Sequence, residues 1–121
     1  MTTLTAEQKS LVQEKATAIR VSILKAVTAA KSGHPGGSLS IADLMALLYY
    51  VEMNVDPKNP KDGNRDRFVL SKGHAAPALY ATLAEKGFFD KGELENLRKI
   101  DCMLQGHPDM KHTPGVDMST G

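Results

Sequence analysis

The sequence contains no tryptophan, and aromatic residues make up only 5% of its 121 residues. It has one cysteine, which excludes an internal disulfide framework and predicts a reducing, intracellular setting. Neither sign of charge prevails, because 15 Lys and Arg face 14 Asp and Glu, so nucleic acid and anionic membranes are not indicated as partners. No apolar run approaches the length of a membrane span, and no signal-peptide core follows Met1.

The residues that are present describe one domain of modest size. Apolar residues account for 41% and charged residues for 24%, which provides a core and an ordinary soluble surface. The single thiol, Cys102, has no Cys or His at metal-ligand spacing. We therefore interpret it as a small, partly buried side chain rather than a metal ligand.

Helical patterns dominate the first half of the chain. Thr5 followed three residues later by Gln8 is a capping box, which predicts the start of a first helix. That helix is expected to end near Lys31, with Gly33 supplying the left-handed stop. A second helix is predicted after it, with Ser40 and Asp43 as its cap and first-turn acid. Its buried face is expected to consist of residues at helical spacing: Leu44, Leu47, Leu48 and Val51.

The one strand candidate is Arg67–Ser71, whose continuously apolar centre is typical of a strand buried on both faces. A third helix is predicted after it, with Pro77 in its first turn and Gly87 after its end. Asp90 is expected to cap a short fourth helix, and Gln105–Gly121 is expected to form a long functional loop. One strand cannot make a sheet, so its neighbours lie either outside this chain or on a partner.

Three of the four histidines directly follow a glycine: His34, His74 and His107. Each lies in a loop or at the end of an element, where a rigid scaffold can aim a side chain into a cleft. Glycine lets a ligand approach the backbone, and imidazole can donate, accept or move a proton near neutral pH. Loop histidines are also common surface residues, but the shared pattern favours a functional role for these three. No pair has the spacing of a helical zinc site, and His112, which lacks the glycine, is expected to be solvated.

Two stretches of small residues are candidates for anion binding through backbone N–H groups, namely Gly36-Gly37-Ser38 and Met118–Gly121. Neither matches a P-loop or a dinucleotide fingerprint, and the first could equally be a plain turn between helices. Lys72 follows the strand candidate at its carboxyl end, where ligands of open parallel sheets bind. It is therefore a further candidate for ligand contact.

These residues lie in three segments that together resemble the amino-terminal part of transketolase, a thiamine diphosphate enzyme. The segments read SGHPGGSLSIADLMALLY, RDRFVLSKGHAAPALYATLAEKG and QGHPDMKHTPGVDMSTG, and they occur in the family's order and spacing. The resemblance implies an α/β, three-layer thiamine-diphosphate-binding fold with a parallel sheet. Residues 1–121 would form an incomplete, helix-rich amino-terminal portion of its diphosphate-binding domain. The start of the chain is similar to that of transketolases split over two chains.

The resemblance also implies a reaction, in which a two-carbon ketol unit passes from a ketose phosphate to an aldose phosphate through thiamine diphosphate. His34 and His107 would be catalytic and would bind the substrate. His34 would contact the sugar hydroxyls, and His107 would hydrogen-bond the donor's C1 hydroxyl and carbonyl oxygen. His74 would lie beside the cofactor diphosphate, and Gly121 would begin the backbone cradle that holds it.

The family's ligands for Mg2+, and the glutamate that activates its cofactor, do not occur in the motifs of these 121 residues. The resemblance therefore implies a partner, either a carboxy-terminal transketolase half or a second subunit, in a homo- or hetero-oligomer. It implies a cytoplasmic enzyme of the pentose phosphate pathway that acts on sugar phosphates. We expect the isolated chain to be inactive, which turnover of xylulose 5-phosphate with ribose 5-phosphate would refute.

Other functions are compatible with the same residues. A dihydroxyacetone synthase differs in its acceptor, which this part of the sequence does not reveal. Deoxyxylulose-phosphate synthase shares the SGHPG opening but departs from the second segment. A non-catalytic fragment that binds a partner subunit or a phosphorylated ligand is the alternative from another functional class.

Overall fold

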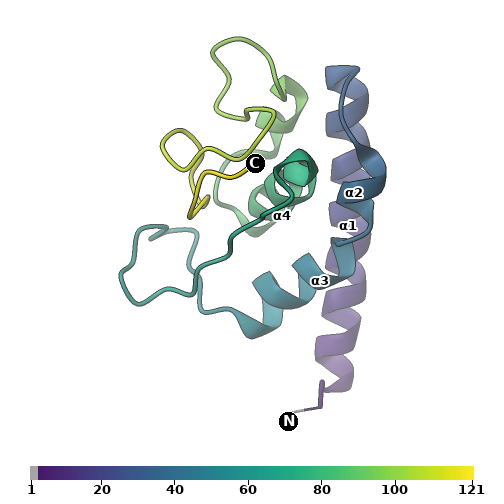
Figure 1. Ribbon diagram of the computed structural model, residues 1–121. Coiled ribbons are helices and arrows are strands. Elements are labelled where there is room, and N and C mark those ends of the chain that lie inside the picture. The colour runs from purple at the N-terminus through teal and green to yellow at the C-terminus, as the bar shows by residue number, and fades with distance from the viewer. Residues whose placement is uncertain (1–2) are drawn as a thin grey trace.

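The computed structural model describes residues 3–121, and every regular element in this range is helical. The long helix α1 runs along one side, α2 and α3 lie against it, and α4 packs beside them (Figure 1). The carboxy-terminal loops, yellow in Figure 1, lie next to α4. The elements are α1 (Ala6–Ala30), α2 (Pro35–Leu39), α3 (Ala42–Leu47), the π-helical turn η1 (Leu48–Glu52), the 3-10 turn η2 (Gly73–Ala75), α4 (Ala76–Lys86) and the 3-10 helix η3 (Lys91–Asn96).

The start of α1 confirms the predicted capping box. The Thr5 hydroxyl accepts a hydrogen bond from the Gln8 N–H at 3.0 Å, and the Gln8 side chain accepts one from the Thr5 N–H at 2.9 Å. The helix ends near Lys31, as predicted, but the residue that supplies the left-handed stop differs from the prediction. Lys31, with φ 54°, is the left-handed cap, and its N–H donates to the last turn, whereas Gly33 follows with φ 136°. The Lys31 N–H donates to the carbonyls of Val27 and Thr28, which offsets the cost of a positive φ at a residue other than glycine.

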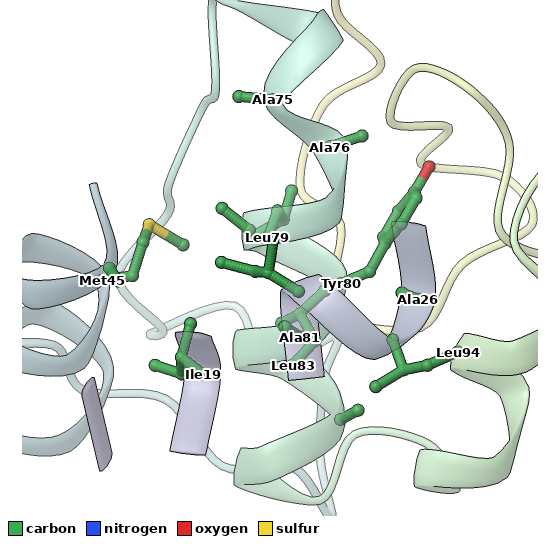
Figure 2. Close-up of a cluster of buried hydrophobic side chains, with 14 of the residues drawn as sticks. Ile19, Ala26, Met45, Ala75, Ala76, Leu79, Tyr80, Ala81, Leu83 and Leu94 are labelled. Carbon is green, nitrogen blue, oxygen red and sulfur yellow. The ribbon is translucent and has the colours of Figure 1, made fainter. Parts of the chain in front are cut away.

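The core lies where α1, α3 and α4 meet (Figure 2). Ile19 and Ile23 of α1 are fully buried, and nine consecutive residues of α4, from Ala76 to Ala84, are buried on all sides. Four of these nine are alanine, and small side chains let the helices approach closely. A helix that is apolar all round belongs in an interior, so α4 is the central element around which the loops arrange.

The second predicted helix is wrong in two respects. It is divided into α2 and α3, and the N-cap of α3 is Ile41 and not Ser40, whose hydroxyl donates to the Gly37 carbonyl instead. Asp43 lies in the first turn of α3, as predicted. The predicted buried face is also wrong, because Leu44 is 50% exposed. The buried residues are Ala42, Met45, Ala46 and Tyr49, which have the same spacing. The face with two alanines packs on α1 because it allows the closer contact.

The predicted strand at residues 67–71 is not formed, and residues 3–121 contain no strand, so the expected parallel sheet is not confirmed. A strand exists only through a ladder to a neighbour. Within the described residues, the one hydrogen bond from this segment's backbone N–H groups runs from Phe68 to the Asp117 carboxylate, at 2.9 Å. The third helix is confirmed as α4, which has Pro77 at its start and Gly87, φ 102°, after its end. The fourth is a 3-10 helix capped by Asp90 as predicted.

The loop from Gln105 to Gly121 is irregular, as predicted. In the part of the chain that the structure describes, none of the helices has the length and apolar character that crossing a membrane requires.

Candidate active site

The three histidines of the Gly-His pattern meet at one cavity of about 140 Å³. The rings of His34 and His74 lie edge to face, with centroids 5.5 Å apart. A larger hollow of about 450 Å³ lies between α1 and η3, but no histidine lines it. Side-chain chemistry therefore locates the candidate site, and size does not. The cavity is lined by Gly33, His34, His74, Pro77, Leu97, Arg98, Gly106 and His107.

Each histidine is positioned by the start of an element or by a turn. His34 is the N-cap residue of α2, where Pro35 begins the helix with its fixed φ. His74 lies in the 3-10 turn η2, which leads directly into the buried helix α4. All three imidazoles are exposed to the cavity side of the chain, while the elements that carry them are anchored in the core. This arrangement presents movable protons on a rigid support.

His107 closes the site against Gly73 and Gly121. The His107 Nδ1 atom lies 2.9 Å from the Gly121 carbonyl oxygen, which can only accept a hydrogen bond, so Nδ1 carries the proton. The Nε2 atom of the same ring is then the one left for a ligand. A Cβ atom on Gly73 would lie 2.8 Å from the Gly121 Cα atom and 2.9 Å from His107 Nδ1. Backbone and imidazole thus approach so closely that only glycine fits at residue 73.

Tyr80 connects this turn to the core. It is fully buried in α4, and its hydroxyl points out of the hydrophobic cluster toward the loop (Figure 2). The hydroxyl lies 2.6 Å from the Gln105 carbonyl oxygen and 3.2 Å from the His107 carbonyl oxygen. Burial raises the pKa of the Tyr80 phenol, as does the charge of Asp109, so Tyr80 keeps its proton and remains a donor. The sequence pattern of α4 did not reveal this anchor.

We expect Tyr80→Phe to destabilise the Gly106–His107 turn by about 1–2 kcal/mol, because the two carbonyls lose their donor. Amide hydrogen exchange of the peptide that covers residues 103–112 measures this loss in the complete protein. Tyr50→Phe is the matched control, since the buried Tyr50 hydroxyl has no hydrogen-bond partner in the structure. Its removal is expected to leave exchange in that peptide unchanged. Equal effects of the two variants would contradict the role of Tyr80.

Lys72 does not face the cavity, although its position after the strand candidate made it a candidate for ligand contact. Its ammonium donates to the Gly37 carbonyl at 2.7 Å and to the Ser40 hydroxyl at 3.0 Å. Gly37 in turn lies against the His74 ring, since a Cβ atom on Gly37 would be 3.2 Å from His74 Nε2. The turn at Gly36-Gly37-Ser38 therefore packs on the site through its backbone.

Two charged residues were missed by sequence reasoning, and one of them, Arg98, lines the cavity. Arg98 lines the cavity with a left-handed backbone, φ 65°, and its guanidinium lies beside Gly106, with Nε 3.5 Å from the position of a Cβ atom there. Asp117 is buried and accepts hydrogen bonds from Arg65 Nε and the Phe68 N–H, both at 2.9 Å. No local pattern marks Asp117, because its partners Arg65 and Phe68 are distant in sequence.

The fourth histidine lies outside the cavity, as its lack of a preceding glycine suggested. His112 is exposed and pairs with Asp109, with 2.6 Å between Nδ1 and Oδ2. This hydrogen bond lowers the pKa of the Asp109 carboxyl below its ordinary value. Residues 3–121 contain no cluster of three or more His, Cys, Asp or Glu side chains arranged to hold a metal ion.

A glycine-lined backbone contact beside three imidazoles defines a site for a small polar ligand with hydroxyl or phosphoryl groups. The chain belongs to the transketolase family, because residues 11–121 match the model of the transketolase, thiamine diphosphate binding domain. It is 48% identical over 115 residues to a 6-deoxy-6-sulfo-D-fructose transketolase subunit of Clostridium sp. (strain MSTE9), covering 95% of this chain and 42% of that protein. It is also 48% identical to human transketolase over 109 residues, covering 90% of this chain and 17% of that one.

The fold agrees with this membership. The structure superposes on a transketolase from Leishmania mexicana with a TM-score of 0.87 at 34% identity, over 91% of this chain and 17% of that chain. The chain therefore spans less than half the length of each relative named here. The predicted family is confirmed, and the fold of the described residues is like that of a part of these enzymes.

Proposed function

We propose that this chain is the amino-terminal part of a transketolase, a transferase that moves a two-carbon ketol unit from a ketose phosphate to an aldose phosphate. One observation carries the proposal: His34, His74 and His107, from three distant loops, line one cavity beside the Gly73–Gly121 contact. Membership of the transketolase family supports the same function. The domain assignment follows, with residues 1–121 as part of the diphosphate-binding domain.

The residues present fit thiamine diphosphate. The close approach of Gly73 and Gly121 leaves a side-chain-free backbone surface, which suits a diphosphate group. His74 lies next to it in η2, so we assign cofactor contacts to His74 and to the Gly121 backbone. Thiamine diphosphate supplies, when bound, a nucleophilic thiazolium carbon, which is the chemistry that ketol transfer requires.

The substrate roles fall to the other two histidines. Because His107 Nδ1 donates to the Gly121 carbonyl, its Nε2 is directed to hydrogen-bond the donor's C1 hydroxyl and carbonyl oxygen. His34 stands edge to face with His74 across the cavity, where it would contact the sugar hydroxyls and assist proton movement. The two histidines thus bind and orient the ketose and exchange protons with its oxygens.

We assign the remaining parts of the site to protein outside residues 1–121. We infer that Mg2+ accompanies the cofactor with ligands from elsewhere in the protein, and that a carboxy-terminal half or partner subunit completes the enzyme. We also propose the parallel sheet for the complete protein. Residues 67–71 would form one of its strands there, paired with neighbouring strands from outside this chain. We propose that the complete protein is an oligomeric, cytoplasmic enzyme of the pentose phosphate pathway and that it acts on sugar phosphates.

The experiment that tests this function uses the complete protein containing this chain, together with its partner subunit where there is one. We expect thiamine-diphosphate-dependent ketol transfer from xylulose 5-phosphate to ribose 5-phosphate, and we expect His107→Ala to lower kcat/KM for the ketose by about 10²-fold. The Kd of the cofactor should change by less than about 3-fold, because His107 is assigned to the substrate.

His112→Ala is the matched control, since this histidine is exposed and paired with Asp109 outside the cavity. It is expected to retain the activity of the unmodified protein. If the two variants have the same ketose kinetics, the substrate role of His107 is wrong. If the complete protein transfers no ketol unit with any pair of sugar phosphates, the proposed function is wrong.

A further inference from the structure

We propose that Lys72 is a positioning residue that holds His34 and His74 together by capping helix α2 from across the chain. The inference rests on the proposed function for its kinetic consequences, but the contacts that support it are independent of that function. Lys72 Nζ lies 2.7 Å from the Gly37 carbonyl oxygen and 3.0 Å from the Ser40 hydroxyl, and the Ser40 hydroxyl itself donates to the same carbonyl at 2.9 Å.

Helix α2 needs such a partner because it is only five residues long. A short helix leaves most of its carbonyls without an intrahelical donor, and α2 has no basic residue in its last turn. The next two N–H groups, of Ser40 and Ile41, donate to Gly36 and Ser38 and leave the Gly37 carbonyl to side chains. The Lys72 ammonium provides a charge-assisted hydrogen bond there, which is stronger than a neutral one.

The bond connects two of the three histidines. Lys72 immediately precedes Gly73-His74, and the helix that it caps has His34 as its N-cap residue. The backbone of Gly37 is the surface on which the His74 ring rests, at 3.2 Å from Nε2 to the position of a Cβ atom. A weaker bond from the Ser38 hydroxyl to the Ala75 carbonyl, at 3.4 Å, joins the same two segments. When the hydrogen bonds of the Lys72 ammonium to Gly37 and Ser40 are lost, α2 loses its main polar contact with the segment that carries His74. The edge-to-face contact between the imidazoles of His34 and His74 is then lost as well.

His107 provides an internal reference. It is held by the Gly121 carbonyl and by the Tyr80 anchor, and neither of these two hydrogen bonds involves α2. Loss of the Lys72 bond should therefore disturb His34 and His74 and leave His107 unchanged. A general loss of stability would affect all three histidines together.

The test compares Lys72→Met, which keeps the length and apolar stem but removes the ammonium, with the unmodified complete protein. Histidine modification by diethylpyrocarbonate, followed site by site with mass spectrometry, is expected to change at least about 3-fold in rate at His34 and His74 but not at His107. Donor kcat/KM should fall by about 10²-fold, as a displacement near 1 Å produces, while the cofactor Kd changes by less than about 3-fold. Ser40→Ala, which removes one of the two contacts, is the control with a smaller effect.

Unchanged modification rates at His34 and His74 would overturn the proposal, as would equal changes at all three histidines. A cofactor Kd weakened as much as the donor kinetics would identify Lys72 as a diphosphate ligand and also overturn it. If Lys72→Met does not fold, Lys72→Leu, which also lacks a donor, takes its place with the same criteria. The modification pattern needs no transferase activity, so a protein without ketol transfer disproves the proposed function and still decides the role of Lys72.

Discussion

Replacing Asp117 with alanine is expected to destabilise the loop 54–65 and the segment 67–71 by about 3–5 kcal/mol. Asp117 is 7% exposed and its partner Arg65 is 13% exposed, so the loss of the carboxylate leaves a buried guanidinium without its counter-charge. The Phe68 N–H loses its acceptor in the same change. One carboxylate therefore holds two segments to the final loop of the chain, and two groups, the Arg65 guanidinium and the Phe68 N–H, lose their partner together.

Hydrogen exchange of the peptides spanning residues 54–72 in the complete protein measures this effect. Asp43→Ala is the matched control, because Asp43 forms a salt bridge with Arg20 at 2.8 Å but is 76% exposed. Exposed pairs contribute about 0–1 kcal/mol, so this variant should exchange almost as the unmodified protein does. Similar protection losses in the two variants would show that burial of the Arg65–Asp117 pair does not matter.

The parts of the fold that sequence predicts correctly are those specified by neighbouring residues. The capping box at Thr5 and Gln8 forms as predicted, and Pro77 and Gly87 delimit α4 as predicted. The parts that fail depend on distant contacts. A strand at residues 67–71 requires a ladder that no other described segment provides. The local sequence therefore shows that residues 67–71 suit a buried strand, but it does not show which segment would pair with them.

The orientation of α3 shows a second limit. Two faces of this segment have the same helical spacing, one with leucines and one with Ala42, Met45 and Ala46. Hydrophobicity favours the leucines, but close packing on α1 buries the face with small residues and leaves Leu44 half exposed. The periodicity of apolar residues predicts that a helix forms here. Which face of α3 is buried depends on how well that face packs against α1.

The candidate site divides in the same way. The Gly-His pattern is local, so the sequence alone selects the three histidines that line one cavity. The Tyr80 anchor and the buried Arg65–Asp117 pair escape sequence reasoning, because Tyr80 reaches a carbonyl 25 positions away and Arg65 reaches Asp117 at a separation of 52. A glycine that is required for space, such as Gly73, likewise becomes visible only when its neighbours are placed.

Gly73→Ala is expected to have a large effect on function. Residue 73 does not have a positive φ, so alanine is conformationally acceptable there, and its cost is purely steric. The new methyl would lie 2.8 Å from the Gly121 Cα atom, 2.9 Å from the Thr120 carbonyl oxygen and 2.9 Å from His107 Nδ1. Two of these neighbours are backbone atoms, which cannot rotate away as a flexible side chain does.

We therefore expect overpacking to cost about 3 kcal/mol and to separate His107 from Gly121, with a further loss of about 10²-fold in kcat/KM for the ketose. In contrast to His107→Ala, this variant should also weaken cofactor binding, since the backbone surface assigned to the diphosphate is itself displaced. Calorimetric titration of the complete protein with thiamine diphosphate, together with ketose kinetics, measures both losses.

Gly36→Ala adds the same methyl in helix α2, where no heavy atom lies within 4 Å of the new Cβ position. Because residue 36 is in helix α2, alanine is expected to be neutral or to stabilise it by about 0.5–1 kcal/mol. The pair separates a requirement for space from a general requirement for glycine near the histidines. If Gly73→Ala binds the cofactor as tightly as Gly36→Ala does, the contact between Gly73 and Gly121 is not the diphosphate cradle, and that part of the site must be sought elsewhere.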